Sequence, residues 1–252
     1  MPINTYEKAI TALTGLGPIR VWSVLVTVFG DLAHETALDG STLSAIMAEI
    51  GIKPEATRVA LYRLRSDGWV RSEKTGRTSR YSLTDKGAHD SAAANPRIYG
   101  TPNQMGFEAQ VILLPTVGID IDPARYSQIA PRLFIGTKGA PIPEGAMMLH
   151  PAELPPWLGS QFESKALLEG YSALLFVLRE IEMHLRNTPL TALQVCVLRV
   201  LIVHAWRRLT LKHPDLPRAA HSTDWCGHDC RSLITILLTR LKLPTIDEIT
   251  TT

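Results

Sequence analysis

Apolar side chains recur at the spacing of an α-helix in three segments of the first 70 residues, 18–30, 41–51 and 54–68. In the third segment, Thr57, Ala60, Leu61 and Leu64 form one stripe. Residues typical of helix ends agree with this pattern: Pro18, Ser41 or Thr42, and Pro54 suit the three starts, and Gly30, Gly51 and Gly68 suit the three ends. The pattern therefore predicts three short helices in succession.

The pattern changes to that of strands after Gly68. Residues 69–71 and 80–83 are short runs on either side of a turn that contains Gly76, which predicts a β-hairpin. Two helices joined by a short Gly-containing turn form a helix-turn-helix. A hairpin directly after them completes the order of elements expected for a winged helix-turn-helix.

The middle of the chain is rich in Pro and Gly and carries weaker signals. Residues 109–114 and 132–136 predict strands, 123–129 predict a short helix, and Met147 and Met148 suit the end of a third strand. No functional residue is expected in this part.

Beyond residue 160 the apolar pattern is helical again. Long stripes over 167–185, 189–204 and 233–241 predict an all-α region with its own core. Such wide stripes also suit a dimer surface. Arg199 interrupts the apolar run from Val195 to Val203.

Composition places the chain among ordinary globular proteins. Of its 252 residues, 45% are hydrophobic and 20% are charged, which excludes wholesale disorder. Three cysteines cannot form a disulfide framework, and no apolar run approaches the roughly 20 residues that span a bilayer. With no signal peptide visible at the start, we expect a reduced, cytoplasmic protein with no membrane segment.

The net charge of +2 hides an uneven distribution. Residues 31–52 carry four acidic and no basic side chains, whereas residues 53–87 carry nine Lys or Arg against four Asp or Glu. The predicted helix-turn-helix and hairpin therefore hold a local excess of +5. Arginine matches both phosphate and the guanine edge, so this block predicts binding to double-stranded DNA.

Eight residues are the candidates for DNA contact, on the third helix and on the hairpin: Arg58, Val59, Tyr62, Arg63, Arg65, Lys74, Arg77 and Arg80. The alternative is that these arginines are merely solvated on a surface helix. Asp67 and Glu73 suit local salt bridges better than base contacts. Whether Tyr62 contacts DNA or covers the hairpin stays open.

Neither a metal site nor an enzyme is expected. His221, Cys226, His228 and Cys230 include zinc-ligand types, but they contain no Cys-x-x-Cys pair. Dinucleotide-binding, P-loop, nucleophile-elbow and His-Glu-x-x-His patterns are missing from the sequence. We therefore predict no cofactor, no metal and no catalytic residues.

Several motifs together resemble the PaaX family of bacterial repressors of phenylacetate degradation and their relatives. The motifs are residues 57–64 (TRVALYRL), 68–69 (GW) and 76–87 (GRTSRYSLTDKG), with Phe29-Gly30-Asp31, Arg97-Ile98-Tyr99, residues 201–208 (LIVHAWRR), 213–217 (HPDLP) and 224–231 (DWCGHDCR). They lie in the correct order at both ends of the chain, and the middle matches weakly. In this family Cys226 stands where proline is usual and Cys230 where a small residue is usual, which indicates packing positions.

The resemblance implies an α+β fold, mostly α, in three units. These are a winged helix-turn-helix over 1–100, a small α/β, ferredoxin-like unit over 101–160, and an all-α unit over 161–252 for dimerisation and effector sensing. A homodimeric repressor would bind a DNA operator and be released by an acyl-coenzyme A such as phenylacetyl-coenzyme A. A thioester-processing enzyme with a winged-helix appendage, and a protein-interaction module, are the alternatives.

The effector expectation falls on His204, Arg207 and Arg208, whose side chains suit the phosphates and thioester of a coenzyme A ester. A lone His on an apolar helix face is more often a core residue with an internal hydrogen bond. In the same way, Arg207 and Arg208 suit ion pairs with Glu180 or Glu182.

Overall fold

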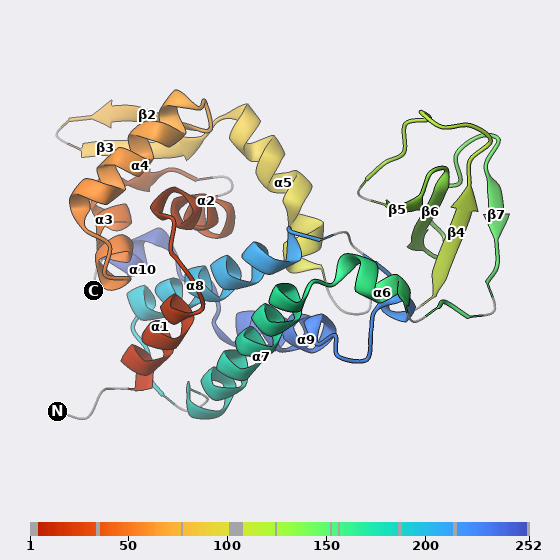
Figure 1. Ribbon diagram of the computed structural model, residues 1–252. Coiled ribbons are helices and arrows are strands. Elements are labelled where there is room, and N and C mark those ends of the chain that lie inside the picture. The colour runs from red at the N-terminus through yellow and green to blue at the C-terminus, as the bar shows by residue number, and fades with distance from the viewer. Residues whose placement is uncertain are drawn as a thin grey trace.

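The computed structural model describes residues 5–33, 36–76, 78–100, 108–123, 125–151, 153–155, 157–185, 188–213 and 216–250. It confirms a mixed fold in which helices predominate and two small antiparallel sheets are present. Figure 1 shows a large helical body that carries one sheet at its upper edge, and a smaller body built on the other sheet beside it. In the part of the chain that the structure describes, no helix is both long enough and apolar enough to cross a membrane.

Residues 5–99 form five helices and a three-stranded sheet. The elements are α1 (Thr5–Gly15), α2 (Val21–Leu32), β1 (Leu38–Asp39), α3 (Gly40–Glu49), α4 (Pro54–Ser66), β2 (Val70–Thr75), β3 (Thr78–Leu83) and α5 (Asp85–Tyr99). β3 lies between β1 and β2, and both pairings are antiparallel. The three predicted helices and the hairpin are thus present in the expected order.

The C-terminal ends of α3 and α4 follow the sequence signals. After α3, Gly51 has φ of +85° and Ile52 donates its backbone N–H to Met47 O, and after α4 Gly68 has φ of +67° and Trp69 donates to Leu64 O. Both turns need a left-handed residue, which glycine adopts without steric cost.

Two predicted helix starts are wrong. α2 begins at Val21, so Pro18 lies in the preceding loop rather than at the first helical position. α3 begins at Gly40 after Asp39, and neither Ser41 nor Thr42 caps it. Thr42 is buried in the core instead, and its hydroxyl finds no hydrogen-bond partner among the described residues.

The smaller body contains a four-stranded antiparallel sheet of order β5-β6-β4-β7. Its strands are β4 (Ala109–Leu113), β5 (Tyr126–Ala130), β6 (Leu133–Thr137) and β7 (Met147–Leu149). The helix predicted over 123–129 is wrong, because this segment pairs with β6 as strand β5. Gly136 of β6 permits this pairing, since a Cβ atom there would lie 2.8 Å from the ring of Tyr126.

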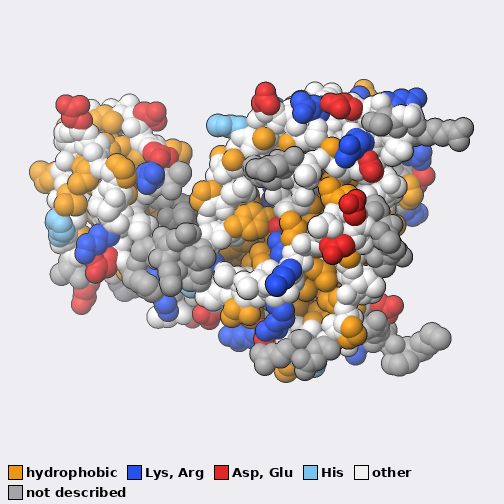
Figure 2. Space-filling view, turned by 180° about the vertical axis from the view of Figure 1, so that it is seen from behind, with side chains coloured by type: hydrophobic (Ala, Val, Ile, Leu, Met, Phe, Trp, Pro, Cys, Tyr) orange, Lys and Arg blue, Asp and Glu red, His pale blue; other side chains and the backbone are white. Residues whose placement is uncertain are grey.

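No helix lies between these strands in the described residues of the middle unit, so the ferredoxin-like arrangement remains an implication of the resemblance. One face of the sheet packs on Leu158 and on Leu216 and Ala220 of the C-terminal region. Figure 2 shows hydrophobic side chains at the surface of this smaller body. Val117 and Met147 are two exposed hydrophobic residues of this body.

The C-terminal elements form the rest of the helical body. They are α6 (Trp157–Phe162), α7 (Lys165–Leu185), α8 (Ala192–Thr210), the short 3-10 helix η2 (Arg218–Ala220), α9 (Gly227–Arg240) and α10 (Ile246–Thr250). α8 begins at Ala192, three residues after the predicted start at Pro189, because Thr191 and Gln194 form a capping box there. α9 begins at Gly227, earlier than the apolar stripe that predicted it.

α8 is the central helix of the molecule. It packs against α1, α2, α3 and α5 on the N-terminal side and against α7, α9 and α10 on the C-terminal side. Leu198, Val200 and Ile202 are fully buried, and one continuous hydrophobic core joins the two ends of the chain. The position of α2, and of α4 packed on α2, therefore depends on α8.

Candidate nucleic-acid interface and the junction behind it

The outward face of α4 carries all five residues predicted from this helix. Arg58, Val59, Tyr62, Arg63 and Arg65 are exposed, while Ala60, Leu61 and Leu64 on the opposite face are buried. Tyr62 is 72% exposed, so it does not cover the hairpin. Arginines around an exposed aromatic ring form a surface suited to a polyanion that also presents flat, apolar groups.

The basic side chains make solvated local contacts. Arg58 Nη2 lies 2.9 Å from Glu55 Oε1, Arg63 Nε lies 3.7 Å from Asp67 Oδ2, and Arg80 Nε lies 3.2 Å from Asp39 Oδ1. Because exposed ion pairs of this kind contribute about 0–1 kcal/mol, these guanidinium groups can exchange partners at low cost. The expected local role of Asp67 is confirmed. The guanidinium of Arg63 also lies 5.5 Å from the ring centre of Trp22.

The hairpin places further basic residues beside α4. Lys74 pairs with Ser79 across the strands and its side chain is exposed, and the turn uses Gly76 at φ of +62°. Arg77 lies outside the described residues. The hairpin is joined firmly to the rest of the body, because Thr84 Oγ1 donates to Gly68 O at 2.6 Å and accepts the N–H of Gly87 at the start of α5.

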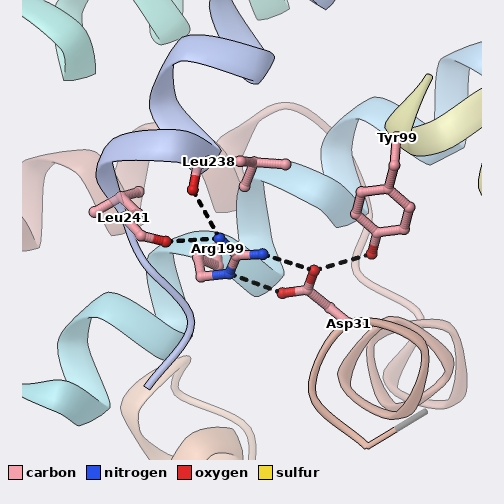
Figure 3. Close-up of polar contacts among 5 residues, drawn as sticks. All are labelled: Asp31, Tyr99, Arg199, Leu238 and Leu241. Atoms are coloured by element: carbon pink, nitrogen blue, oxygen red, sulfur yellow. Dashed lines mark hydrogen bonds and ion pairs between the residues drawn. The ribbon is translucent and has the colours of Figure 1, made fainter. Parts of the chain in front are cut away.

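Behind this surface, α2 is held to α8 by a buried ion pair. Asp31, at the end of α2, accepts hydrogen bonds from Arg199 Nε and Nη2, each at 3.1 Å (Figure 3). The side chain of Asp31 is 3% exposed and that of Arg199 is 10% exposed. A bidentate contact of this geometry is the strongest form of arginine–carboxylate pair.

Groups at the ends of two more helices, α5 and α9, form hydrogen bonds with the same ion pair. The Tyr99 hydroxyl, at the end of α5, donates to Asp31 Oδ1 at 3.0 Å, and burial beside this carboxylate raises the pKa of Tyr99. Arg199 Nη1 donates to Leu238 O at 3.0 Å and to Leu241 O at 2.6 Å, both at the end of α9 (Figure 3). One guanidinium thus joins α2 and, through Asp31, α5 to the C-terminal helices.

Further hydrogen bonds join the end of α5 to the C-terminal helices. Trp206 Nε1 donates to Ile98 O at 3.0 Å, and Arg97 donates to the carbonyl of Thr210. Arg231 of α9 donates to Gly100 O at 3.0 Å, and its guanidinium lies 5.0 Å from the Trp206 ring centre. We call these contacts, together with the Asp31–Arg199–Tyr99 cluster, the junction.

Sequence reasoning did not assign a role to Asp31, Tyr99 or Arg199. A signal was present, because Arg199 interrupts an apolar helix and Asp31 and Tyr99 belong to motifs of the family resemblance. An arginine in the middle of a buried stripe requires a buried acceptor. The sequence does not reveal which carboxylate this is, since Asp31 lies 168 residues away.

The three candidate effector residues lie against the segment that contains α1 and α2. His204 Nδ1 is 3.4 Å from Thr27 Oγ1, and Arg207 Nη1 donates to that same oxygen and to Ser23 O. Arg208 approaches Gly17, where a Cβ atom would lie 2.5 Å from its Nη2. The expected pairs with Glu180 and Glu182 do not form, because these carboxylates contact His184 and Arg240.

Arg207 borders a cavity of about 40 Å³ between α2, α5 and α8, which has room for about one water molecule. His204 is 3% exposed, and its Nε2 has no hydrogen-bond partner within the described residues. Burial, together with the charges of Arg207 and Arg208, lowers the pKa of His204 to about 4.

The His and Cys residues considered for zinc lie in two neighbouring pairs, with the rings of His221 and His228 5.3 Å apart and Cys226 in contact with Cys230. His221 Nδ1 contacts Glu163 Oε1 at 2.7 Å and its ring stacks on Trp225, while Cys230 Sγ donates to Tyr171 O. The described residues contain no group of three His, Cys, Asp or Glu side chains arranged to hold a metal ion. These contacts indicate structural roles at the base of α9.

Two sequence models of one protein family match the chain. The model for "PaaX-like protein" matches residues 20–87, and the model for "PaaX-like protein C-terminal domain" matches residues 162–246. The first segment contains α4, the hairpin and Asp31, and the second contains Arg199.

Individual proteins agree with these matches. The transcriptional repressor PaaX of Escherichia coli (strain K12) is 25% identical over 250 positions, which cover 86% of this chain and 78% of the repressor. Among solved structures, the uncharacterised protein Rv0674 from Mycobacterium tuberculosis aligns with a TM-score of 0.52 at 18% identity, over 91% of this chain and 97% of that one. This structural likeness concerns the fold alone.

The Asp31–Arg199 pair predicts a large effect of a small substitution. Asp31→Asn leaves the guanidinium of Arg199 buried without its counter-charge, so we expect the free energy of unfolding to fall by about 3–5 kcal/mol. Glu169→Gln, which removes the partner of the exposed Lys165, is the control and should cost less than about 1 kcal/mol. Equal losses in urea titrations of the two variants would contradict the assignment.

His204 predicts a dependence of stability on pH. Its pKa is about 4 in the folded protein against an ordinary 6.5, so the unfolded chain takes up a proton first as the pH falls. The contribution is complete above pH 6.5 and is lost between pH 6.5 and about 4, by about 3 kcal/mol. His204→Gln should therefore lose less stability over this range than the native protein, whereas His184→Gln, at an exposed position, should behave like the native protein. Parallel curves for all three proteins would exclude a buried neutral His204.

Proposed function

Because the chain belongs to the PaaX-like family, we propose that it is a transcriptional repressor that binds double-stranded DNA. The observation that carries this proposal is the exposed basic face of α4, which lies next to the hairpin in a segment matched by the family model. The similarity to a named transcriptional repressor along most of the chain supports the same function.

In this proposal α3, α4 and the β2–β3 hairpin form a winged helix-turn-helix. α4 is the recognition helix and enters the major groove, with Arg58, Tyr62 and Arg65 near base edges or phosphates. Val59 suits contact with a thymine methyl group. The hairpin, through Lys74, reaches the adjacent backbone or minor groove.

Arg63 and Arg80 are less available for contact with DNA than the other candidate residues, because each already has partners in the protein. Arg63 lies against Asp67 and over Trp22, and Arg80 pairs with Asp39 at the edge of the sheet. We infer that these two residues contact phosphate only after exchanging their partners. Alternatively, Arg63 positions α4 and Arg80 positions β3.

The proposed organisation has three units, 1–100 for DNA binding, 101–160 as a small sheet unit, and 161–252 for dimerisation and effector sensing. A symmetric homodimer would present two copies of α4 to half-sites about one helical turn apart. An acyl-coenzyme A is the effector that the family implies. The cavity beside Arg207 is too small for such a ligand, so these residues would act on release through the contacts of His204 and Arg207 with α2 and of Arg208 with the loop before it.

The direct test is capture of genomic fragments from the host of this protein, followed by sequencing and by binding measurements on the enriched fragment. A transcriptional repressor should enrich a short, partly palindromic sequence upstream of a gene or operon. Absence of DNA binding at about 50 mM salt, where phosphate contacts are strongest, would refute the proposal.

Arg58→Ala tests the reading surface of α4. If Arg58 contacts a base, the variant should lose about 1–3 kcal/mol of affinity for the enriched sequence and discriminate less at one base pair. Arg179→Ala, at an exposed position of α7, is the matched control and should bind like the native protein. Competition titrations with single-base variants of the site measure both quantities, and unchanged discrimination would remove Arg58 from the interface.

Lys74→Ala tests the hairpin. If its ammonium group neutralises one phosphate, the slope of log affinity against log salt should decrease in magnitude by about 1, with no change in sequence preference. Lys242→Ala, beyond the end of α9, should leave the slope unchanged. An unaltered slope for Lys74→Ala would place this part of the hairpin off the DNA.

A further inference from the structure

A tryptophan of α2 lies against one of the arginines of α4. The Cζ atom of Arg63 lies over the ring of Trp22, 5.5 Å from the ring centre. This distance is within the limit of about 6 Å at which a guanidinium and an aromatic face attract each other. The attraction acts between the charge and the face of the ring, so it requires no hydrogen bond from the arginine.

Trp22 is a rigid platform for this contact. It is the second residue of α2, is half-buried and packs against the hydrophobic core. α2 is itself held to α8 by the Asp31–Arg199 pair. The body of the protein therefore sets the position of the ring, whereas the side chain of Arg63 is long and has several rotatable bonds.

The contact with Trp22 leaves the N–H groups of Arg63 unbonded. The side chain of Arg63 is 63% exposed, and its Nε lies 3.7 Å from Asp67 Oδ2, which is too long for a hydrogen bond. Arg63 forms no hydrogen bond to any other residue that the structure describes. Because an exposed ion pair of this kind exchanges at low cost, only the loose contact with Asp67 has to be replaced before Arg63 binds an anion.

The place of Arg63 on α4 indicates which part of DNA it meets. At about 3.6 residues per turn, Val59 and Tyr62 lie at the centre of the exposed face, with Arg63 on one flank and Arg65 on the other. A helix fills the width of the major groove, so the flanks of its exposed face point to the phosphates that border the groove. The fork of a guanidinium matches the oxygens of a phosphate.

We propose that Trp22 is a positioning residue for DNA binding, which holds the guanidinium of Arg63 where a phosphate at the edge of the major groove accepts its N–H groups. The inference rests on the proposed function. When DNA binds, a phosphate replaces Asp67 and the contact with Trp22 is kept. Without the ring, Arg63 keeps its charge but its side chain is immobilised only on binding, which weakens the complex.

The binding experiment uses the full-length protein and the DNA fragment enriched from the genome. Trp22→Leu should bind about two- to tenfold more weakly, the cost of immobilising one long side chain, and should keep the native salt slope because Arg63 keeps its charge. Arg63→Ala should reduce the magnitude of the slope by about 1. Trp22→Phe, which retains an aromatic face, should bind nearly as the native protein does. Native affinity of Trp22→Leu, or a reduced slope, would overturn the inference.

Double variants separate positioning of Arg63 from a general effect of Trp22 on α2. Trp22→Leu should cause no further loss of affinity when Arg63 is already alanine, and its full loss when Arg65, on the opposite flank, is alanine. Trp157→Leu, at an exposed position of α6, is the control and should bind like the native protein. A loss that persists in the Arg63→Ala background would assign Trp22 a packing role only.

Thermal unfolding establishes that each variant is folded. Should Trp22→Leu not fold, Arg63→Lys decides, because it keeps the charge but lacks the planar group that the ring holds. We expect Arg63→Lys to bind about two- to tenfold more weakly, and native affinity would overturn the inference. If the native protein does not bind the fragment, the proposed function fails. If it binds and the losses of Trp22→Leu and Arg63→Ala add, this inference fails alone.

Discussion

The bidentate contact between Asp31 and Arg199 is the interaction on which the arrangement of this molecule depends. It joins residues 168 positions apart, and both side chains are withdrawn from water. Buried charges are costly unless every donor and acceptor is matched. Here the guanidinium also bonds two carbonyls at the end of α9, and the carboxylate also accepts the Tyr99 hydroxyl. Such directional contacts specify one relative position of α2, α5, α8 and α9, which apolar packing alone specifies less sharply.

Because of this geometry, α8 connects the N-terminal helices to the C-terminal helices. Along its length, Arg199, His204 and Arg207 contact α2, and Trp206 contacts the end of α5. α4 packs on α2, so the proposed reading surface is supported by the C-terminal half of the protein. A change at α9 that moves Arg199 therefore reaches α4 through α8 and α2, because α8 packs on α2 and α2 packs on α4.

Local signals in the sequence were sufficient to predict the elements of the proposed DNA-binding surface. Gly51 predicted the turn before α4, and Pro54 and Gly68 predicted the two ends of this helix. The buried stripe of Ala60, Leu61 and Leu64 correctly predicted that the arginines lie on the exposed face. Elements that depend on distant partners could not be predicted in this way. Strand β5 is stabilised by its pairing with β6, and the space for Tyr126 is created by Gly136. The partner of Arg199 is likewise a matter of tertiary structure.

The arginines of this chain fall into two groups, one exposed and one buried, and each group has a different role. On α4 and the hairpin they are solvated, loosely paired and able to exchange a carboxylate for a phosphate. At the junction, Arg199 and Arg231 are buried and bonded to backbone carbonyls or to Asp31, where their planar geometry fixes helix positions. A count of charges along the sequence treats both groups alike. Electrostatic attraction to DNA is the role proposed for the first group, whereas the second group fixes the positions of the helices, because buried charges interact with little screening.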